Sequence, residues 1–136
     1  MAHQLSQAYS ACCSDSVHGH GYICELFLCS NVLDNTGMVI DFGEVKAKIG
    51  KYINSWDHCL VMPSTMPQEY LDMLKKYNKN IKIVDYNPTA ENMARDMFLT
   101  IKREHRELPL QKIRLHETET GWAEYSEEDP YYADDI

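Results

Sequence analysis

A long apolar segment that begins near residue 18 is introduced by the stretch CCSDSVHGHGY, residues 12–22. His18 and His20 are two positions apart, and side chains at i and i+2 of a β-strand point to the same face. Two neutral imidazoles on one face suit a divalent metal, usually zinc, which needs a third protein ligand. Gly19 and Gly21 allow another group to approach the backbone closely. The spacing by itself fits either a metal site or two ordinary polar strand residues.

The composition excludes several classes of protein. The 136 residues include 13 Lys and Arg and 21 Asp and Glu, which gives a formal net charge of -8. Because the basic residues form no sustained patch, we expect no nucleic acid as the main partner. No apolar run approaches the roughly 20 residues that span a bilayer, so we expect no membrane association. The first residues lack the basic and apolar regions of a signal peptide.

The cysteines indicate the compartment. There are five of them, an odd number, and none belongs to a C-x-x-C pair. This usage favours free thiols in a reducing cytoplasm over a disulfide framework. The length predicts one domain over residues 1–136.

Periodicity and turn residues predict the order of the elements. Strands are expected over residues 18–32, 38–40, 57–62, 81–84, 111–118 and 122–125. Helices are expected over residues 42–55 and 67–78, and a third is expected to end near His105. Asp41 and Thr89 have the chemistry of N-caps for the first and third helices. The acidic tail, about residues 126–136, is expected to be loosely held.

The order is a β-hairpin, a helix, an excursion that contains short strands and a further helix, another helix and a second β-hairpin. It predicts an α+β fold in which an antiparallel four-stranded sheet is covered on one face by two helices. Such a small sheet leaves its edges exposed, and a long apolar edge favours pairing with another chain. We therefore expect an oligomer.

Other polar groups lie at the ends of predicted elements. Asp57 precedes His58 directly after the first long helix, where the carboxylate could tune a proton-transfer imidazole. The alternative is a helix-end Asp beside a surface His. Glu117 ends a strand and could accept paired N–H donors from a guanine-like or pterin-like ring, or it could be a solvated strand-end residue. A thiol upstream of His18 is a candidate base or nucleophile.

Several motifs occur together in one order along the chain. They are His3-Gln4-Leu5, a Cys before His18-Gly19-His20-Gly21-Tyr22, Gly37-Met38-Val39-Ile40-Asp41-Phe42, Asp57-His58, Pro88-Thr89-Ala90-Glu91-Asn92, Glu117-Thr118 and Trp122-Ala123-Glu124-Tyr125. In this combination, residues 2 to about 125 resemble the 6-pyruvoyl-tetrahydropterin synthase and 6-carboxytetrahydropterin synthase family.

The resemblance implies a tunnelling fold. Trimers of such subunits close a β-barrel through their sheet edges, and two trimers stack into a homohexamer with active sites between subunits. The resemblance also implies that His3, His18 and His20 hold a catalytic zinc ion (Zn2+). The substrate it implies is 7,8-dihydroneopterin triphosphate, a small-molecule pterin.

The same resemblance assigns the remaining site residues. A Cys, an Asp and a His transfer protons in the family, and they match Cys13, Asp57 and His58. Glu117 matches the glutamate that anchors the pterin. We place Thr118 and Thr89 at the substrate as well, although helix capping is the main role expected of Thr89.

The product depends on the branch of the family. The pyruvoyl branch eliminates triphosphate and keeps the carbon skeleton, whereas the carboxy branch also loses acetaldehyde on the way to 7-deazaguanines such as queuosine. The ending at residues 122–125 and the excursion at residues 63–85 favour the carboxy branch. The alternatives are a pyruvoyl synthase and a non-catalytic zinc- or pterin-binding module.

Two features depart from the family pattern. Members carry a strand's worth of residues before the first zinc histidine, whereas only Met1 and Ala2 precede His3 here. The thiol position is Ser14 by the spacing of one branch and Cys12 by that of another. The Tyr9-Ser10 frame aligns best with Cys13, which we favour.

Overall fold

The structure is a computed structural model that describes residues 1–128 and 132–135. Its strands are β1 (Ala2–His3), β2 (His18–Gly19), β3 (Ile23–Leu28), β4 (Leu60–Pro63), β5 (Ile81–Val84), β6 (Leu110–His116), β7 (Gly121–Ser126) and β8 (Tyr132–Asp135). Its helices are α1 (Ala11–Ser14), α2 (Phe42–Asn54), α3 (Gln68–Tyr77) and α4 (Ala90–Glu104). The fold is α+β, as the sequence predicts.

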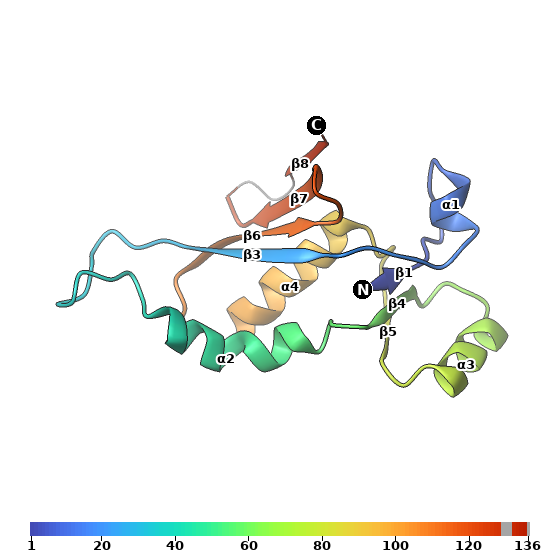
Figure 1. The fold of residues 1–136 in the computed structure, drawn as a ribbon, viewed down its shortest axis with the longest axis horizontal. Helices are drawn as coiled ribbons and strands as arrows, with labels where there is room; N and C mark the ends of the chain where they lie inside the picture. Colours follow the sequence, from blue (N-terminus) through green and yellow to red (C-terminus); the bar gives the residue numbers. More distant parts are fainter. Residues whose placement is uncertain (129–131, 136) are drawn as a thin grey trace.

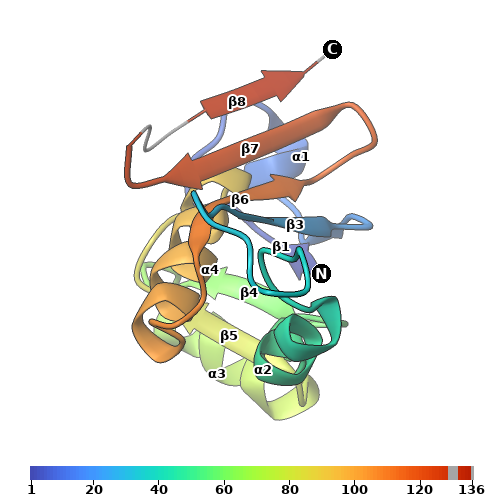
Figure 2. The same cartoon turned by 90° about the vertical axis from the view of Figure 1, so that its left-hand side faces the viewer.

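One sheet is antiparallel and has the strand order β3-β6-β7-β8 (Figure 2). Its strands alternate between apolar and polar residues, so that one face can be buried and the other remains polar. On the apolar face, Leu26 is paired with Ile113, and Leu115 is paired with Ala123. Helix α4 packs against this face on β6 and β7.

Helix α4 supplies the other half of the main core. The buried side chains of Met93, Met97, Phe98 and Ile101 recur at helical spacing, which is the stripe that an amphipathic helix turns toward a sheet. Ile49 and Trp56, on and just after α2, extend the same core. The two predicted covering helices are therefore α2 and α4 (Figure 1).

A second, mixed sheet has the order β2-β1-β4-β5 and differs from the single sheet that we expected. Strand β1 is antiparallel to β2 and parallel to β4, and β4 is parallel to β5. The pairing makes His3 the direct partner of His18. This sheet therefore brings the N-terminus to the His-Gly-His stretch.

The predicted first hairpin is wrong in two respects. The expected strand over residues 18–32 is divided between β2 and β3 and ends at Leu28, and residues 38–40 form no strand. In this segment, hydrogen bonds between side chains and the nearby backbone take the place of the strand-to-strand hydrogen bonds of a hairpin. The Asp34 carboxylate accepts bonds from the N–H groups of Thr36 and Met38, and the Ser30 hydroxyl bonds the backbone of Val32.

Both predicted N-caps are confirmed. The Asp41 carboxylate accepts a 2.6 Å hydrogen bond from the Gly43 N–H, and Thr89 Oγ1 accepts one of 3.3 Å from the Asn92 N–H. Each cap satisfies an N–H group that the first turn of a helix leaves free. Helices α2 and α4 therefore begin where their sequences predict.

The C-terminal segment contains a strand that we did not predict. Strand β8 pairs antiparallel with β7, which makes β3 and β8 the edges of the antiparallel sheet. The expectation of a loosely held tail at about residues 126–136 falls partly on residues 129–131 and 136, which lie outside the described residues. Neither sheet closes into a barrel within the described part of one chain. No helix in that part has both the length and the apolarity to cross a bilayer.

Candidate functional site

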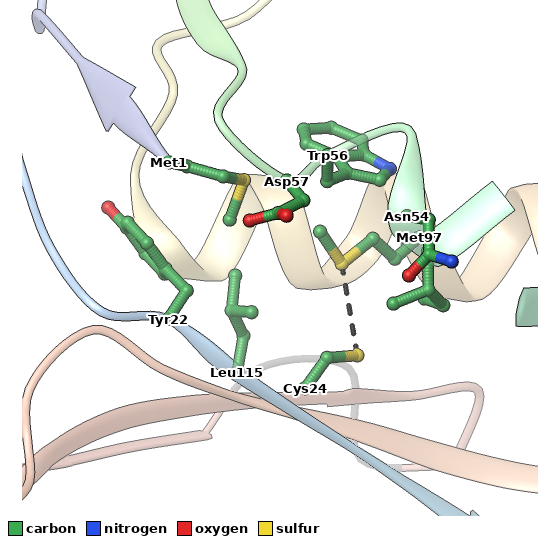
Figure 3. Close-up of a pocket in the computed structure, with 9 residues that line it drawn as sticks. Met1, Tyr22, Cys24, Asn54, Trp56, Asp57, Met97 and Leu115 are labelled. Carbon is green, nitrogen blue, oxygen red and sulfur yellow. Dashed lines mark hydrogen bonds between the residues drawn. The ribbon is translucent and has the colours of Figure 1, made fainter. Parts of the chain in front are cut away.

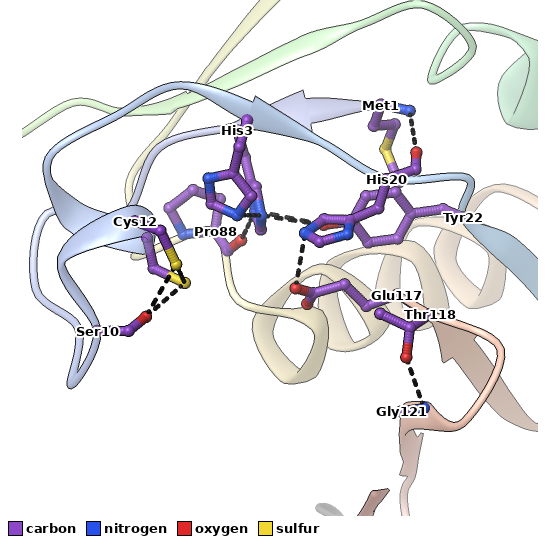
Figure 4. A network of polar contacts seen from close by, with 12 residues as sticks. Met1, His3, Ser10, Cys12, His20, Tyr22, Pro88, Glu117, Thr118 and Gly121 are labelled. Atoms are coloured by element: carbon purple, nitrogen blue, oxygen red, sulfur yellow. Dashed lines mark hydrogen bonds and ion pairs between the residues drawn. The ribbon is translucent and has the colours of Figure 1, made fainter.

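The side chains of His3, His18, His20 and Glu117 lie close together at the β2–β1 side of the mixed sheet. Figure 4 shows those of His3, His20 and Glu117. Each offers one ligand atom, and all four atoms lie within 4.8 Å of one another. Nε2 of His3 is 3.2 Å from Nε2 of His18, and Nε2 of His20 is 3.1 Å from Oε1 of Glu117. The structure thus brings together the three histidines that the resemblance named as metal ligands.

The burial of His3 determines its charge. The residue is only 1% exposed, and burial, reinforced by the neighbouring His18 and His20, lowers its pKa to about 4. A backbone hydrogen bond to Pro88 opposes this shift and does not overcome it. His3 is therefore neutral at pH 7, the form in which imidazole binds a metal.

Two observations show that these residues fit a zinc ion. Tetrahedral zinc with Zn–N bonds of about 2.0–2.1 Å separates two ligand nitrogens by about 3.3–3.4 Å, close to the distance between the His3 and His18 nitrogens. Nε2 of His20 is buried and makes no hydrogen bond among the described residues, because the Glu117 oxygen 3.1 Å away is not aligned for one. A buried polar atom without a partner is costly, and a bound cation would satisfy it.

Glu117 reaches the histidines from the end of β6. The turn that follows Glu117 is held by two hydrogen bonds to Gly121. The Gly121 N–H donates to Thr118 Oγ1 at 2.8 Å, and the Gly121 carbonyl accepts from the Glu117 N–H at 3.0 Å. Glu117 and Thr118 line a hollow together with Glu91 and Trp122. Glu117 therefore contacts the histidine cluster and also lines a space that a ligand could enter.

Asp57 and His58 lie in the turn that follows α2, and their side chains contact each other. Oδ2 of Asp57 lies 3.1 Å from Nδ1 of His58, and their side chains are 73% and 91% exposed. Both residues line a hollow shared with His20 and Tyr22. Asp57 also lines a neighbouring pocket with Met1, Trp56 and Cys24 (Figure 3).

Cys13 lies on α1 beside a second thiol. Its Sγ accepts a 3.0 Å hydrogen bond from the Ser10 hydroxyl, and it lies 3.8 Å from Sγ of Cys12. Hydrogen bonds from Ser10 and Cys13 lower the pKa of the Cys12 thiol. Among residues 1–128, no hydrogen bond joins the Cys13 thiol to Asp57 or His58, so a single described chain does not assemble the predicted proton-transfer set.

Helix α1 is nevertheless attached to the segment that follows His3. The Leu5 N–H donates to the Cys13 carbonyl at 2.8 Å, and the Gln4 amide donates to the Ser14 carbonyl at 2.8 Å. The two thiols are therefore held on an element adjacent to the histidine cluster. Thr89 is the N-cap of α4, the main role expected of it.

Sequence reasoning missed two groups around His3. The Tyr22 hydroxyl lies 3.2 Å from Nε2 of His3, and the Pro88 carbonyl lies 2.7 Å from Nδ1. Tyr22 follows His20 by two positions, so the same-face spacing that links His18 to His20 could have found it. Burial, with smaller effects of Glu117 and Cys13, raises the pKa of Tyr22, which keeps its hydroxyl protonated. No local pattern points to a backbone carbonyl 85 positions away.

Comparison with known proteins identifies the family of the chain. The pattern of the family described as 6-pyruvoyl tetrahydropterin synthase matches residues 1–128. The 6-carboxy-5,6,7,8-tetrahydropterin synthase of Haemophilus influenzae is 32% identical over 133 residues, which cover 93% of this chain and 92% of the relative. That of Aquifex aeolicus is 34% identical over 122 residues, covering 83% and 75%.

Two further matches differ in length or identity. The Helicobacter pylori (strain J99) protein of the same name is 29% identical over 133 residues, covering 90% of this chain and 66% of that relative. The chain therefore spans a little under two thirds of that protein. A crystal structure of an uncharacterized protein from Wolinella succinogenes superposes with a TM-score of 0.71 at 15% identity, covering 93% of this chain and 92% of that one. It supports the fold alone. From the family pattern over residues 1–128 and the relatives that cover most of its length, the chain belongs to the 6-pyruvoyl tetrahydropterin synthase family.

Proposed function

We propose that the chain is a zinc-dependent lyase, a 6-carboxy-5,6,7,8-tetrahydropterin synthase. It would convert 7,8-dihydroneopterin triphosphate to 6-carboxytetrahydropterin with loss of triphosphate and acetaldehyde, in cytoplasmic 7-deazaguanine and queuosine biosynthesis. The observation that carries the proposal is the convergence of His3, His18 and His20 beside Glu117. The names of the relatives support the choice of branch.

His3, His18 and His20 hold the zinc ion in this proposal. Zinc bound there supplies a Lewis acid for oxygens of the substrate side chain. The three rings come from β1, β2 and the residue after β2, and the neutral state of His3 leaves a lone pair for the metal. The exchangeable position of a catalytic site remains for substrate.

Glu117 binds the pterin ring. A carboxylate accepts two N–H donors from an amidine-like edge in charge-assisted hydrogen bonds. The location of Glu117 and Thr118 in one hollow, next to His20, supports this role. Thr89 lies at the start of α4, and the residue after it, Ala90, lines the same hollow. The ring edge would then be held while the substrate side chain extends toward the histidines.

Asp57, His58 and Cys13 move the protons. Oδ2 of Asp57 accepts the proton on Nδ1 of His58, which leaves Nε2 of His58 to give or take a proton. The Cys13 thiol acts as its thiolate. Because the pair is exposed and lies on a different element from Cys13, the set is completed between subunits.

The assembly is a homohexamer built from two trimers whose sheet edges close a barrel. Support comes from the free edge of β3, where Ile23 is 60% exposed. An apolar groove lies beside this edge, lined by Leu26, Leu28, Met38 and Phe42. Apolar surface next to an unpaired edge favours strand pairing with another chain. Native mass spectrometry should give six times the 15.8 kDa chain mass.

One incubation tests the reaction. The zinc-loaded protein is mixed with 7,8-dihydroneopterin triphosphate, and the pterin product, triphosphate and acetaldehyde are identified by mass spectrometry. The proposal expects 6-carboxytetrahydropterin with acetaldehyde. Triphosphate with 6-pyruvoyltetrahydropterin and no acetaldehyde would make the chain a pyruvoyl synthase. Tight pterin binding without triphosphate release would make it a non-catalytic module.

A further inference from the structure

The loop before α4 is joined to the segment that follows His3 through Asn87. Oδ1 of Asn87 accepts a 2.8 Å hydrogen bond from the Ser6 N–H, and Nδ2 donates one of 2.9 Å to the Gln7 carbonyl. One amide side chain thus holds the backbone of two consecutive residues. Ser6, the first of the two, lies three positions after His3, a proposed metal ligand.

The backbone of Asn87 is itself held by α4. Its carbonyl accepts a 2.9 Å bond from Nδ2 of Asn92, in the first turn of the helix, and a 2.7 Å bond from the Thr89 N–H. The position of the loop is therefore determined by the helix and not by the loop alone. Asn87 connects the N-terminal segment to the helix that forms half of the core.

The residue after Asn87 contacts the ring of His3. The Pro88 carbonyl lies 2.7 Å from Nδ1 of His3, and Pro88 is fully buried. A carbonyl can only accept, so Nδ1 carries the proton and Nε2 presents its lone pair toward His18. The opposite tautomer would place a proton on the nitrogen that has to bind the metal.

We propose that Asn87 is a positioning residue for zinc binding. Asn87 orients His3 through the Pro88 carbonyl, and Asn92 in turn holds the backbone of Asn87. The proposal rests on the zinc site of the proposed function. Outer partners of this kind fix the orientation and tautomer of a metal-binding histidine. Two side chains and one backbone carbonyl act in sequence: Asn92 holds Asn87, Asn87 holds the segment after His3, and the adjoining Pro88 carbonyl holds the ring.

His3 needs such support more than His18 does. Nδ1 of His18 lies 3.3 Å from the carbonyl of Ser16, two residues earlier, so a local contact orients that ring. His3 belongs to a strand of two residues, and its ring partner lies 85 positions away. Only tertiary contacts can hold those two segments in register, and Asn87 makes two of them.

The test measures zinc affinity without turnover. Metal-free protein is titrated with zinc in competition with a chromophoric chelator, for the unaltered chain and for Asn87→Ala and Asn92→Ala. We expect zinc to bind roughly 10- to 100-fold more weakly in both variants. Asn78→Ala is the matched control, because Asn78 is also half-buried and donates one side-chain bond to a backbone carbonyl, that of Leu74, at the end of α3. Its zinc affinity should stay within about twofold of the unaltered chain.

A spectroscopic signature separates positioning from a general loss of stability. Cobalt(II) in place of zinc reports ligand geometry in its visible absorption, and Asn87→Ala should change the band positions while Asn78→Ala should not. Asn87→Asp keeps the oxygen that accepts from Ser6, so it should retain part of the affinity that Asn87→Ala loses. If Asn87→Ala fails to fold, Asn87→Asp and Asn92→Ala decide the question.

The outcomes also separate this proposal from the proposed function. Folded Asn87→Ala and Asn92→Ala proteins that bind zinc as tightly as the unaltered chain would overturn the positioning role and leave the enzyme assignment intact. An unaltered chain that binds zinc and yields no pterin product would overturn the enzyme assignment and leave the positioning role intact. A chain that binds no zinc at all would overturn both.

Discussion

Nε2 of His3 and Nε2 of His18 face each other at 3.2 Å across the pairing of two strands of two residues each. So short a ladder holds little by itself. The rings are kept in place by further contacts, the Pro88 carbonyl on one side and the pairing of β1 with β4 on the other. The position of these two nitrogens relative to each other therefore tests the proposed metal site most directly.

Replacement of either histidine should abolish metal binding. His18→Ala and His3→Ala each remove one of three ligands, so zinc affinity should fall by more than the roughly 100-fold typical of outer partners, and turnover should be lost with it. Zinc content after dialysis and product formation are the measurements. His105→Ala is the control, since His105 caps α4 and pairs with Glu107 at 3.6 Å. A His18→Ala protein that retains one zinc per chain would remove His18 from the ligand set.

The two thiols of α1 should differ in function. Cys13→Ala is expected to keep its zinc and to lose turnover by roughly 10²- to 10⁴-fold, the usual contribution of a proton-transfer group. Cys12→Ala should stay close to full activity. Zinc content and initial rates are measured on both variants. The reverse pattern would assign the catalytic thiol to Cys12. Hydrogen bonds from Ser10 and Cys13 already lower the pKa of that thiol.

Glu117 should act on substrate affinity and not on metal retention. Glu117→Gln keeps the shape of the side chain but loses the charge that strengthens two hydrogen bonds to the ring, a loss of about 1.5 to 3 kcal/mol. The KM for dihydroneopterin triphosphate should therefore rise roughly 10- to 100-fold while the zinc content is unchanged. Glu119→Gln, on the exposed turn beside it, is the control. Loss of zinc from Glu117→Gln would make this carboxylate a fourth metal ligand instead.

Glu124 should contribute stability that depends on pH. Its side chain is 12% exposed, and burial alone would raise its pKa. Hydrogen bonds from Arg114 and Lys112 outweigh burial, so the pKa lies below the usual range. Because the folded-state pKa is depressed, this stability is fully present above the unfolded-state pKa of about 4.3 and is lost as the pH falls through the lower folded-state value.

Urea unfolding between pH 7 and pH 3 measures this contribution. Glu124→Gln should destabilise the protein at pH 7 by on the order of 2 kcal/mol, since it removes a charged acceptor from two cations. The difference from the unaltered protein should shrink toward pH 3. Glu127→Gln, at an exposed position just after β7, should change neither the stability nor its pH dependence. A Glu124→Gln deficit that is equal at pH 7 and pH 3 would contradict the ionic origin.

Local patterns predicted the parts of the fold that local forces form. Helices α2 and α4 begin at Asp41 and Thr89 as predicted, because an N-cap and an apolar stripe at helical spacing act within a few residues. The hairpin of β6 and β7 also follows, because alternation predicts both strands. The return strand at residues 38–40 was wrong, because the Asp34 carboxylate bonds its own loop, and periodicity does not register that competition.

The sequence by itself determined which side chains could hold a metal, since His18 and His20 are two positions apart and His3 belongs to the motif set of the family. Only the tertiary structure decided that Glu117 lies beside His20, that the Pro88 carbonyl holds the ring of His3, and that Asn87 joins these segments. The physical reason is sequence separation. Spacing along one strand or helix sets the direction of neighbouring side chains, whereas contacts between distant segments depend on how helices and sheets pack around a common core.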